Sequence, residues 1–308
     1  MSVTRAELES FIAELAASVT EPRAGLFGPG SVSWAINRES ILFLGAGRAS
    51  LLQLAHPWVA HGVDQHSATR TDPWGRFQRT FDSVFGILFG DFDKVTRAAR
   101  RVHAIHERVT GEITEDVAAC QRGTRYLAND AQALLWVHAT LIETALEVYE
   151  LVLRPLDAEE REAYYQESKR FARVFGIPDR VLPEDWPAFT RYWDGMLAAE
   201  TLGAGAPARD IARFLLRPTR LGYRSASAWF RVMTAGLLPG RFQREFELPF
   251  GARERRVFEG SLAAIRALYP RLPERVRYVP AYHAAQRRLA RGSTPLASRA
   301  QNAASTFR

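Results

Sequence analysis

DAQALLWVHATLIETALEVYELVL, residues 130–153, carries the strongest helical pattern in the chain. At about 100° per residue, its apolar side chains gather on one face of a helix, and Asp130 is well placed to cap the start. Proline cannot continue a helix, so Pro155 marks the end. His138 lies at the centre of the apolar face. A helix of this length and hydrophobicity predicts an all-α core.

A second predicted helix runs through DKVTRAARRVHAIHERVTG, residues 93–111. One narrow face of this helix is apolar, and arginines lie opposite, where water can solvate them. The apolar face comprises Val95, Ala99, Val102, His106 and Val109. His106 is therefore expected in the middle of the stripe, with His103 at its edge. The ring nitrogens of a buried imidazole need a partner, which can be a side chain, a backbone carbonyl or a metal.

The rest of the chain also predicts helices. The longer patterns cover residues 4–19, 76–90, 157–176 and 184–200, and the shorter ones cover 207–215, 225–236, 241–247, 254–269 and 279–291. Repeated prolines break the second half into short helices, and no strand alternation or internal repeat is present in the sequence. We therefore expect a single large multi-helix, all-α domain over residues 1–290 and a flexible tail over 291–308.

Composition narrows the possible classes of protein. The chain has 47% hydrophobic and 24% charged residues, a formal net charge of +7 and a single cysteine. One cysteine excludes an internal disulfide framework and a cysteine-rich zinc site, and it fits a reducing compartment. The sequence contains no apolar run of the ~20 residues that a membrane span needs. Basic runs with interleaved aromatic residues are absent as well, so we expect a cytoplasmic protein without a nucleic-acid partner.

A glycine-rich stretch, ILFLGAG at residues 41–47, imitates a strand that leads into a nucleotide-binding turn. Gly45 and Gly47 match two of the three glycines of G-x-G-x-x-G, with Ser50 in place of the third. A dinucleotide fold also requires alternating strands and helices, which do not follow in this sequence. We instead expect these glycines to let two helices approach closely or to bend one helix.

The predicted helix over 76–90 carries a basic face. Arg76, Arg79, Thr80 and Ser83 share this face by their spacing of three and four residues. Two guanidinium groups and a hydroxyl can hold a carboxylate or another anion. The alternative is a solvated face that is paired with neighbouring aspartates. Before this helix, His56 precedes Pro57, which disfavours helical geometry at His56 and predicts a break or kink there.

These features together favour a haem pocket. Haem needs an axial imidazole, an apolar slot and cations for its propionates. His106 or His138 can supply the imidazole, and Arg76 and Arg79 can supply the cations. A di-iron bundle would need two Glu-x-x-His motifs and a serine hydrolase would need G-x-S-x-G, neither of which the sequence contains. A non-catalytic binder of haem or of a hydrophobic ligand would share all these features.

The chain resembles the mpaB/latex-clearing-protein family of oxygenases. Four motifs carry the resemblance, in the same order and at matching distances. They are LLQLAHPWVAHGVDQHS (51–67), RFQRT (76–80), VHAIHERVTG (102–111) and YLANDAQALLWVHATLIETA (126–145). The resemblance covers residues 40–150 and extends more loosely to residue 290. It implies an all-α, globin-like pocket that binds b-type haem and activates O2 to oxidise a hydrophobic small molecule.

The resemblance also implies roles for individual residues. The proximal iron ligand of the family falls on His106, and His103, His138 and His56 complete the expected cofactor-binding set. The distal basic-x-x-basic-Thr motif falls on Arg76, Arg79 and Thr80, which are the expected catalytic residues. Rubber-cleaving members carry lysine where this chain has Arg79. Guanidinium is a very poor iron ligand, so cleavage of rubber is not implied here.

Overall fold

The computed structural model describes residues 2–67, 72–217 and 224–292, and helices dominate all three ranges. The helices of the first half are α1 (Arg5–Ser18), α2 (Val32–Asn37), the 3-10 helix η1 (Ser40–Gly45), α3 (Ala46–Leu54), α4 (Pro57–His66), α5 (Pro73–Phe89), α6 (Phe92–His106) and α7 (Ala131–Val152). Between α6 and α7, strands β1 (Thr110–Glu112) and β2 (Arg125–Leu127) pair in antiparallel register.

The helices of the second half are α8 (Ala158–Val174), η2 (Asp179–Val181), α9 (Trp186–Ala198), α10 (Ala206–Leu215), α11 (Arg224–Leu237), α12 (Gly240–Glu245), α13 (Ala252–Leu268), η4 (Tyr269–Arg271), α14 (Glu274–Arg277) and α15 (Pro280–Gly292). The expected all-α, single-domain fold is thus confirmed. Of the expected tail, residues 293–308 lie outside the described residues.

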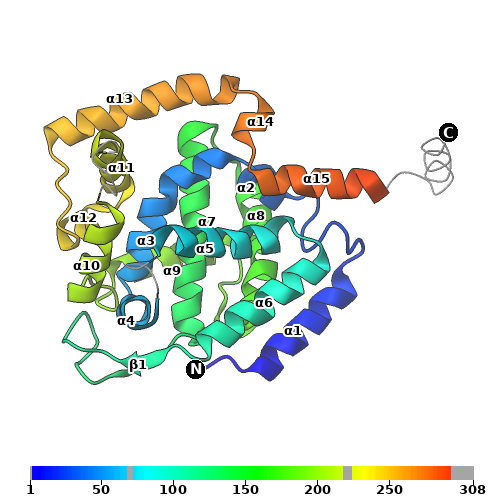
Figure 1. The fold of residues 1–308 in the computed structure, drawn as a ribbon, viewed down its shortest axis with the longest axis horizontal. Helices are drawn as coiled ribbons and strands as arrows, with labels where there is room; N and C mark the ends of the chain where they lie inside the picture. The colour runs from blue at the N-terminus through cyan, green and yellow to red at the C-terminus, as the bar shows by residue number, and fades with distance from the viewer. Residues whose placement is uncertain (1, 68–71, 218–223, 293–308) are drawn as a thin grey trace.

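The long helix α7 runs through the middle of the molecule (Figure 1). Asp130 caps its start by accepting hydrogen bonds from the backbone N–H groups of Gln132 and Ala133, at 2.9 and 3.1 Å. Trp136 is fully buried, donates to the Leu52 carbonyl oxygen at 2.8 Å and stacks on Trp193. The predicted central helix is therefore confirmed, since it contributes side chains to the main hydrophobic core.

The glycine-rich stretch forms helices that pack closely on their neighbours. Residues 40–45 are a 3-10 helix and α3 follows directly, so the strand required by the nucleotide-binding alternative is absent here. A Cβ on Gly45 would overlap the Thr144 side chain of α7, and a Cβ on Gly47 would overlap Thr234 of α11. The two glycines thus allow close helix–helix approach, as expected from the sequence.

Helix α6 ends earlier than its sequence pattern predicts. Its last helical residue is His106, and its buried side chains are Val95, Ala98, Ala99 and His103. The expectation that His106 lies in the middle of the buried stripe was wrong, because His106 is half-buried at the helix end and His103 is the deeper imidazole. The chain leaves helical geometry there because residues 110–112 pair with 125–127.

None of the helices in the described ranges has both the length and the hydropathy that a membrane crossing requires.

Candidate functional site

Two histidines lie at the end of α6, one turn apart. His103 is only 4% exposed, and neither ring nitrogen forms a hydrogen bond within the described chain. Its Nε2 atom lies 3.3 Å from the Glu107 carboxylate, a contact that lacks hydrogen-bond geometry. Burial, assisted by the neighbouring His103, lowers the pKa of His106 to about 4. His106 is therefore a neutral imidazole at physiological pH, which is the form that binds a metal.

His138 is the third buried imidazole, and it comes from α7. It is 5% exposed, and its ring stacks on Phe171 of α8 with centroids 5.9 Å apart. Neither ring nitrogen has a hydrogen-bond partner in the described part of the chain. Burial lowers the pKa of His138 to about 3, so this ring is also neutral. Buried polar atoms are nearly always satisfied, so two orphan nitrogens in the core need a physical explanation.

An apolar cluster connects His138 with the helix of the other two histidines. Phe171 belongs to a buried group of side chains to which α5, α6 and α8 all contribute. From α6 the group takes Val95, Ala98 and Ala99. His138 therefore borders the same apolar volume on which α6 packs, although it lies on a different helix.

The predicted distal residues lie at the start of α5 and face solvent. Arg79 forms a salt bridge with Asp72, with an Nη1–Oδ2 distance of 3.0 Å, and its side chain is 60% exposed. Asp72 also caps α5 by accepting the Gly75 N–H, and these two interactions lower its pKa. Thr80 is exposed as well, and the side chain of Arg76 lies outside the described residues. The structure does not bring Arg79 and Thr80 into the apolar cluster.

His56 has a structural role that the sequence suggests only indirectly. It is the N-cap of α4, and its Nδ1 atom accepts a hydrogen bond from the Trp58 backbone N–H at 3.3 Å. Burial lowers its pKa to about 4, which the negative charge of Asp130 partly opposes. The dipeptide of His56 and Pro57 is the signal, because proline favours the first turn of a helix and the preceding residue becomes the cap.

Two other features of the site region concern charge and metals. Arg48 is buried between α7 and α11, where it donates to the Glu143 carboxylate, to Thr144 Oγ1 at 2.6 Å and to the Leu237 carbonyl oxygen at 2.8 Å. Burial raises the pKa of Glu143, and Arg48 opposes that rise.

The described residues contain no cluster of three metal-binding side chains. Haem requires only one imidazole from the protein.

Fold and site together define a class of proteins: an all-α chain in which a buried, neutral imidazole, His138, borders an apolar cluster. A family model described as "ER-bound oxygenase mpaB/B'/Rubber oxygenase, catalytic domain" matches residues 34–267, about three quarters of the chain. The chain belongs to this oxygenase family, which confirms the resemblance found in its motifs, and it is an enzyme of that class.

Known relatives of the chain come from mycobacteria. An uncharacterised protein from Mycobacterium tuberculosis and another from Mycobacterium bovis are each 25% identical to it over 232 residues. Each of these alignments covers 73% of this chain and 88% of the relative. No solved structure matches the chain significantly.

Proposed function

We propose that this oxygenase uses haem b to oxidise a hydrophobic small molecule with O2, and that His106 is the proximal iron ligand. The observation that carries the proposal is the pair of orphan imidazoles, since both ring nitrogens of His103 and of His138 are buried without a hydrogen bond in the described chain. His138 borders the apolar cluster of α5, α6 and α8, because its ring stacks on Phe171. A neutral imidazole at the border of an apolar cluster fits the donor set that haem needs.

His106 is the best ligand of the three for physical reasons. It is half-buried at the end of a helix, so a planar group can reach its ring, and its lowered pKa keeps the nitrogen lone pair available. The Glu107 carboxylate lies 3.3 Å from His103 Nε2, so it adds negative charge one helical turn from the proposed ligand. Such charge beside a metal-binding imidazole tunes the metal. Haem iron, when bound, supplies the chemistry that activates O2.

The remaining residues of the proposed site would hold the cofactor and orient the substrate. His138 borders the apolar cluster at the side of α8, where its ring stacks on Phe171. Arg79 and Thr80 are the proposed distal residues, and Arg79 would have to leave Asp72 to reach a substrate or a propionate. That exchange costs little, because an exposed salt bridge contributes roughly 0–1 kcal/mol. The single cysteine, Cys120, favours a reducing compartment, and we propose a cytoplasmic location.

The absorption spectrum of the protein after addition of haemin tests this proposal. We expect an intense Soret band that is lost or shifted in His106→Ala. His66→Ala is the matched control, because His66 is exposed and its imidazole contacts the Thr110 carbonyl oxygen, at 3.0 Å. A folded wild-type protein that does not bind haemin would overturn the haem proposal, although membership of the oxygenase family would stand.

A second candidate function is a non-catalytic binder of haem or of a hydrophobic ligand. It is favoured by the placement of Arg79, which is exposed and engaged with Asp72. An oxygenase and a haem binder both predict the Soret band, whereas a binder of another hydrophobic ligand does not, and only an oxygenase consumes O2 in proportion to the oxidised product. Simultaneous recording of O2 uptake and product formation, with a panel of apolar alkenes and lipids, distinguishes the two.

A further inference from the structure

The net positive charge of this protein is concentrated at one end of the chain. We refer to residues 252–292, which form α13, η4, α14 and α15, as the C-terminal edge. It contains ten arginines and three glutamates, a net charge of +7, which equals the formal net charge of the whole chain. Residues 1–251 contain 29 basic and 31 acidic residues. The C-terminal edge is thus a strongly basic surface on an otherwise nearly neutral molecule.

Exposed apolar side chains lie on the same edge. Of the seven large hydrophobic side chains that are exposed in the described residues, four belong to it: Val257, Leu268, Leu272 and Val276. Leu268 and Val276 are 64% and 58% exposed, and the exposed arginines Arg271 and Arg275 lie between them in the chain. Single exposed apolar residues are normal, but a cluster of them at a basic surface indicates an interaction site.

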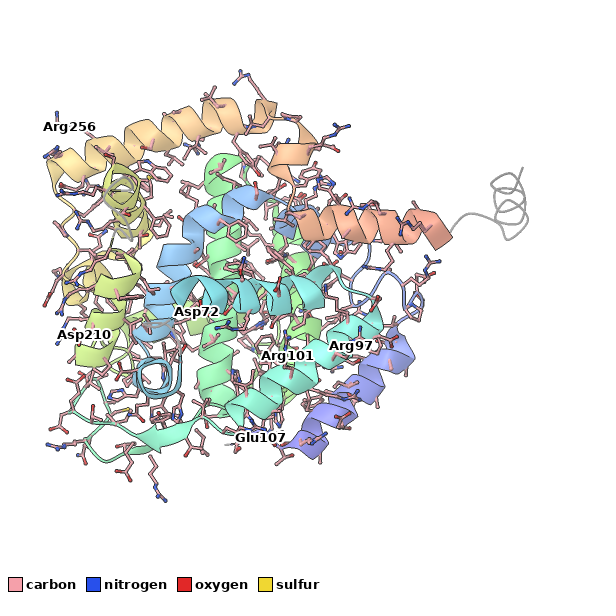
Figure 2. The ribbon with its side chains drawn as sticks, viewed as in Figure 1. Asp72, Arg97, Arg101, Glu107, Asp210 and Arg256 are labelled. Atoms are coloured by element: carbon pink, nitrogen blue, oxygen red, sulfur yellow. The ribbon has the colours of Figure 1, made fainter. Side chains whose placement is uncertain are left out.

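Helix α13 has the pattern of a helix that lies on a surface. Its inner face packs through Phe258, Leu262 and Ile265 onto one hydrophobic cluster of the body. The outward crest consists of small residues and arginine, with Arg256, Gly260, Ala263 and Ala267 all exposed. The helix α13 lies along the outer margin of the molecule, with Arg256 near its N-terminal end (Figure 2). The small residues of this outward face let the helix axis approach a flat surface closely.

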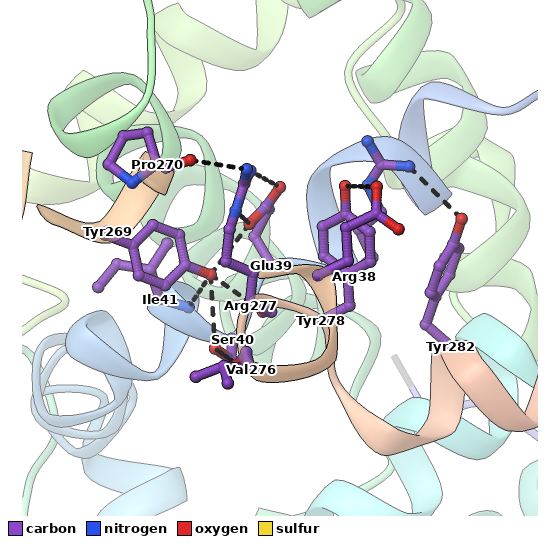
Figure 3. A network of polar contacts seen from close by, with 11 residues as sticks. Arg38, Glu39, Ser40, Ile41, Tyr269, Pro270, Val276, Arg277, Tyr278 and Tyr282 are labelled. Carbon is purple, nitrogen blue, oxygen red and sulfur yellow. Dashed lines mark hydrogen bonds and ion pairs between the residues drawn. The ribbon is translucent and has the colours of Figure 1, made fainter. Parts of the chain in front are cut away.

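The corner between α13 and α14 is fixed to the body of the protein. The Tyr269 hydroxyl donates to the buried Glu39 carboxylate at 2.9 Å and accepts the Ile41 N–H at 3.1 Å (Figure 3). Arg277 donates to the same carboxylate, with an Nη2–Oε1 distance of 2.6 Å. Within the described chain, none of the arginines of α13 forms a salt bridge. The edge therefore presents the arginines of α13, which form no ion pair in the described chain, and exposed apolar side chains from a rigid support.

We propose that the C-terminal edge docks this protein onto the surface of a lipid bilayer that contains anionic phospholipids. Arginines attract the anionic headgroups, and Leu268, Leu272 and Val276 insert at the boundary between headgroups and acyl chains. Attraction to a nucleic acid would not need the apolar side chains. A second copy of this chain offers no excess of acidic charge to attract the edge, because residues 1–251 contain nearly equal numbers of acidic and basic residues. This proposal goes beyond the oxygenase activity and does not depend on haem.

Vesicle flotation with the full chain tests the proposal. We expect binding to vesicles of phosphatidylcholine with phosphatidylglycerol, and little binding to phosphatidylcholine alone. Each arginine near an anionic surface strengthens binding roughly fivefold, so Arg271→Gln with Arg275→Gln should weaken it roughly 30-fold. Leu268→Ser with Val276→Ser should weaken it about tenfold by removing apolar burial. The matched control is Leu127→Ser with Arg125→Gln on β2, where both residues are also exposed.

Several results would overturn the proposal. One is equal binding of the wild type and both edge variants, with circular dichroism confirming that all are folded. Another is binding that the arginine variant loses but the Leu268→Ser, Val276→Ser variant keeps, which would indicate a general polyanion site. A third is a dimer in the wild type, seen by light scattering without vesicles, that the edge variants lack. Unchanged haem binding in the edge variants would separate this surface from the proposed active site.

Discussion

Arg277 and Glu39 form a salt bridge across 238 positions of the chain, with an Nη2–Oε1 distance of 2.6 Å. Glu39 is 3% exposed in its side chain and also accepts a hydrogen bond from the Tyr269 hydroxyl. The neighbouring Arg38 stacks on the Tyr278 ring, 4.4 Å from its centroid. These contacts join the segment before η1 to η4 and α14, so the last part of the domain is held by polar interactions.

Removal of Arg277 should therefore destabilise the fold. Arg277→Met leaves the Glu39 carboxylate buried without its cation, which should lower the free energy of unfolding by about 3 kcal/mol. Urea denaturation followed by circular dichroism measures this change.

Two further variants make that prediction specific. Adding Glu39→Gln to Arg277→Met removes the unpaired charge and should restore part of the lost stability. Arg275→Met, two positions away and exposed, should change the free energy of unfolding by less than about 0.5 kcal/mol. Equal effects of Arg275→Met and Arg277→Met would contradict a role for the salt bridge.

The buried His138 predicts loss of stability in acid. Its pKa is about 3 in the folded protein, against an ordinary value of 6.5. Between these values the unfolded chain binds a proton that the folded protein does not bind. The stability contributed by the neutral ring is therefore complete above pH 6.5 and declines as the pH falls toward 3.

His138→Phe should make this decline shallower, because phenylalanine can keep the stacking on Phe171 and does not titrate. Thermal unfolding of the haem-free protein across this pH range measures the slope. His66→Gln is the comparison, since His66 is exposed and should leave the slope unchanged. A slope that is the same in wild type and His138→Phe would show that the ring is protonated or solvated in the folded state.

Local sequence patterns predict the helices well, and long-range pairing limits what they predict about the site. The central helix and the close packing at Gly45 and Gly47 follow from periodicity and from the position of the glycines. The relative burial of His103 and His106 could not be predicted in this way, because α6 ends where residues 110–112 pair with residues 125–127.

Two buried ion pairs could not be found from the sequence for a similar reason. Arg48 and Glu143 are 95 positions apart, and no local pattern indicates that they meet in the core. Arg277 and Glu39 are further apart still. Charged residues within helices normally face water, so only the tertiary fold shows that these two carboxylates are buried.

Arg79 gives a prediction that separates function from stability. Arg79→Gln removes an exposed salt bridge, so the free energy of unfolding should change by less than about 1 kcal/mol. If Arg79 donates hydrogen bonds at the distal side, O2-dependent product formation should fall on the order of 100-fold. Asp72→Asn is the informative partner, because it breaks the same salt bridge and leaves Arg79 free. An equal loss of activity in both variants would point to the cap of α5 rather than to a distal role.

Gly47 gives a prediction about packing. A Cβ at this position overlaps the Thr234 side chain, so Gly47→Ala should destabilise the protein by about 1–3 kcal/mol through overpacking. Thr234→Ala should relieve the overlap, and the double variant should then be more stable than Gly47→Ala alone. Chemical denaturation of the four proteins of this double-mutant cycle yields the coupling energy. Strict additivity would mean that α3 simply shifts away from α11.

The hairpin of β1 and β2 has a consequence for how the two histidine-bearing helices are spaced. β1 begins at Thr110, shortly after His106, and β2 leads into the Asp130 cap of α7. The register is fixed by Tyr126, which is buried opposite Gly111 and donates to Gln65 at 2.8 Å. A slip by one residue would turn Tyr126 outward, since side chains alternate between the two faces of a strand. The pairing of β1 with β2 thus sets the spacing between α6 and α7. A one-residue deletion within either strand would change the relative position of His106 and His138 while leaving both helices intact.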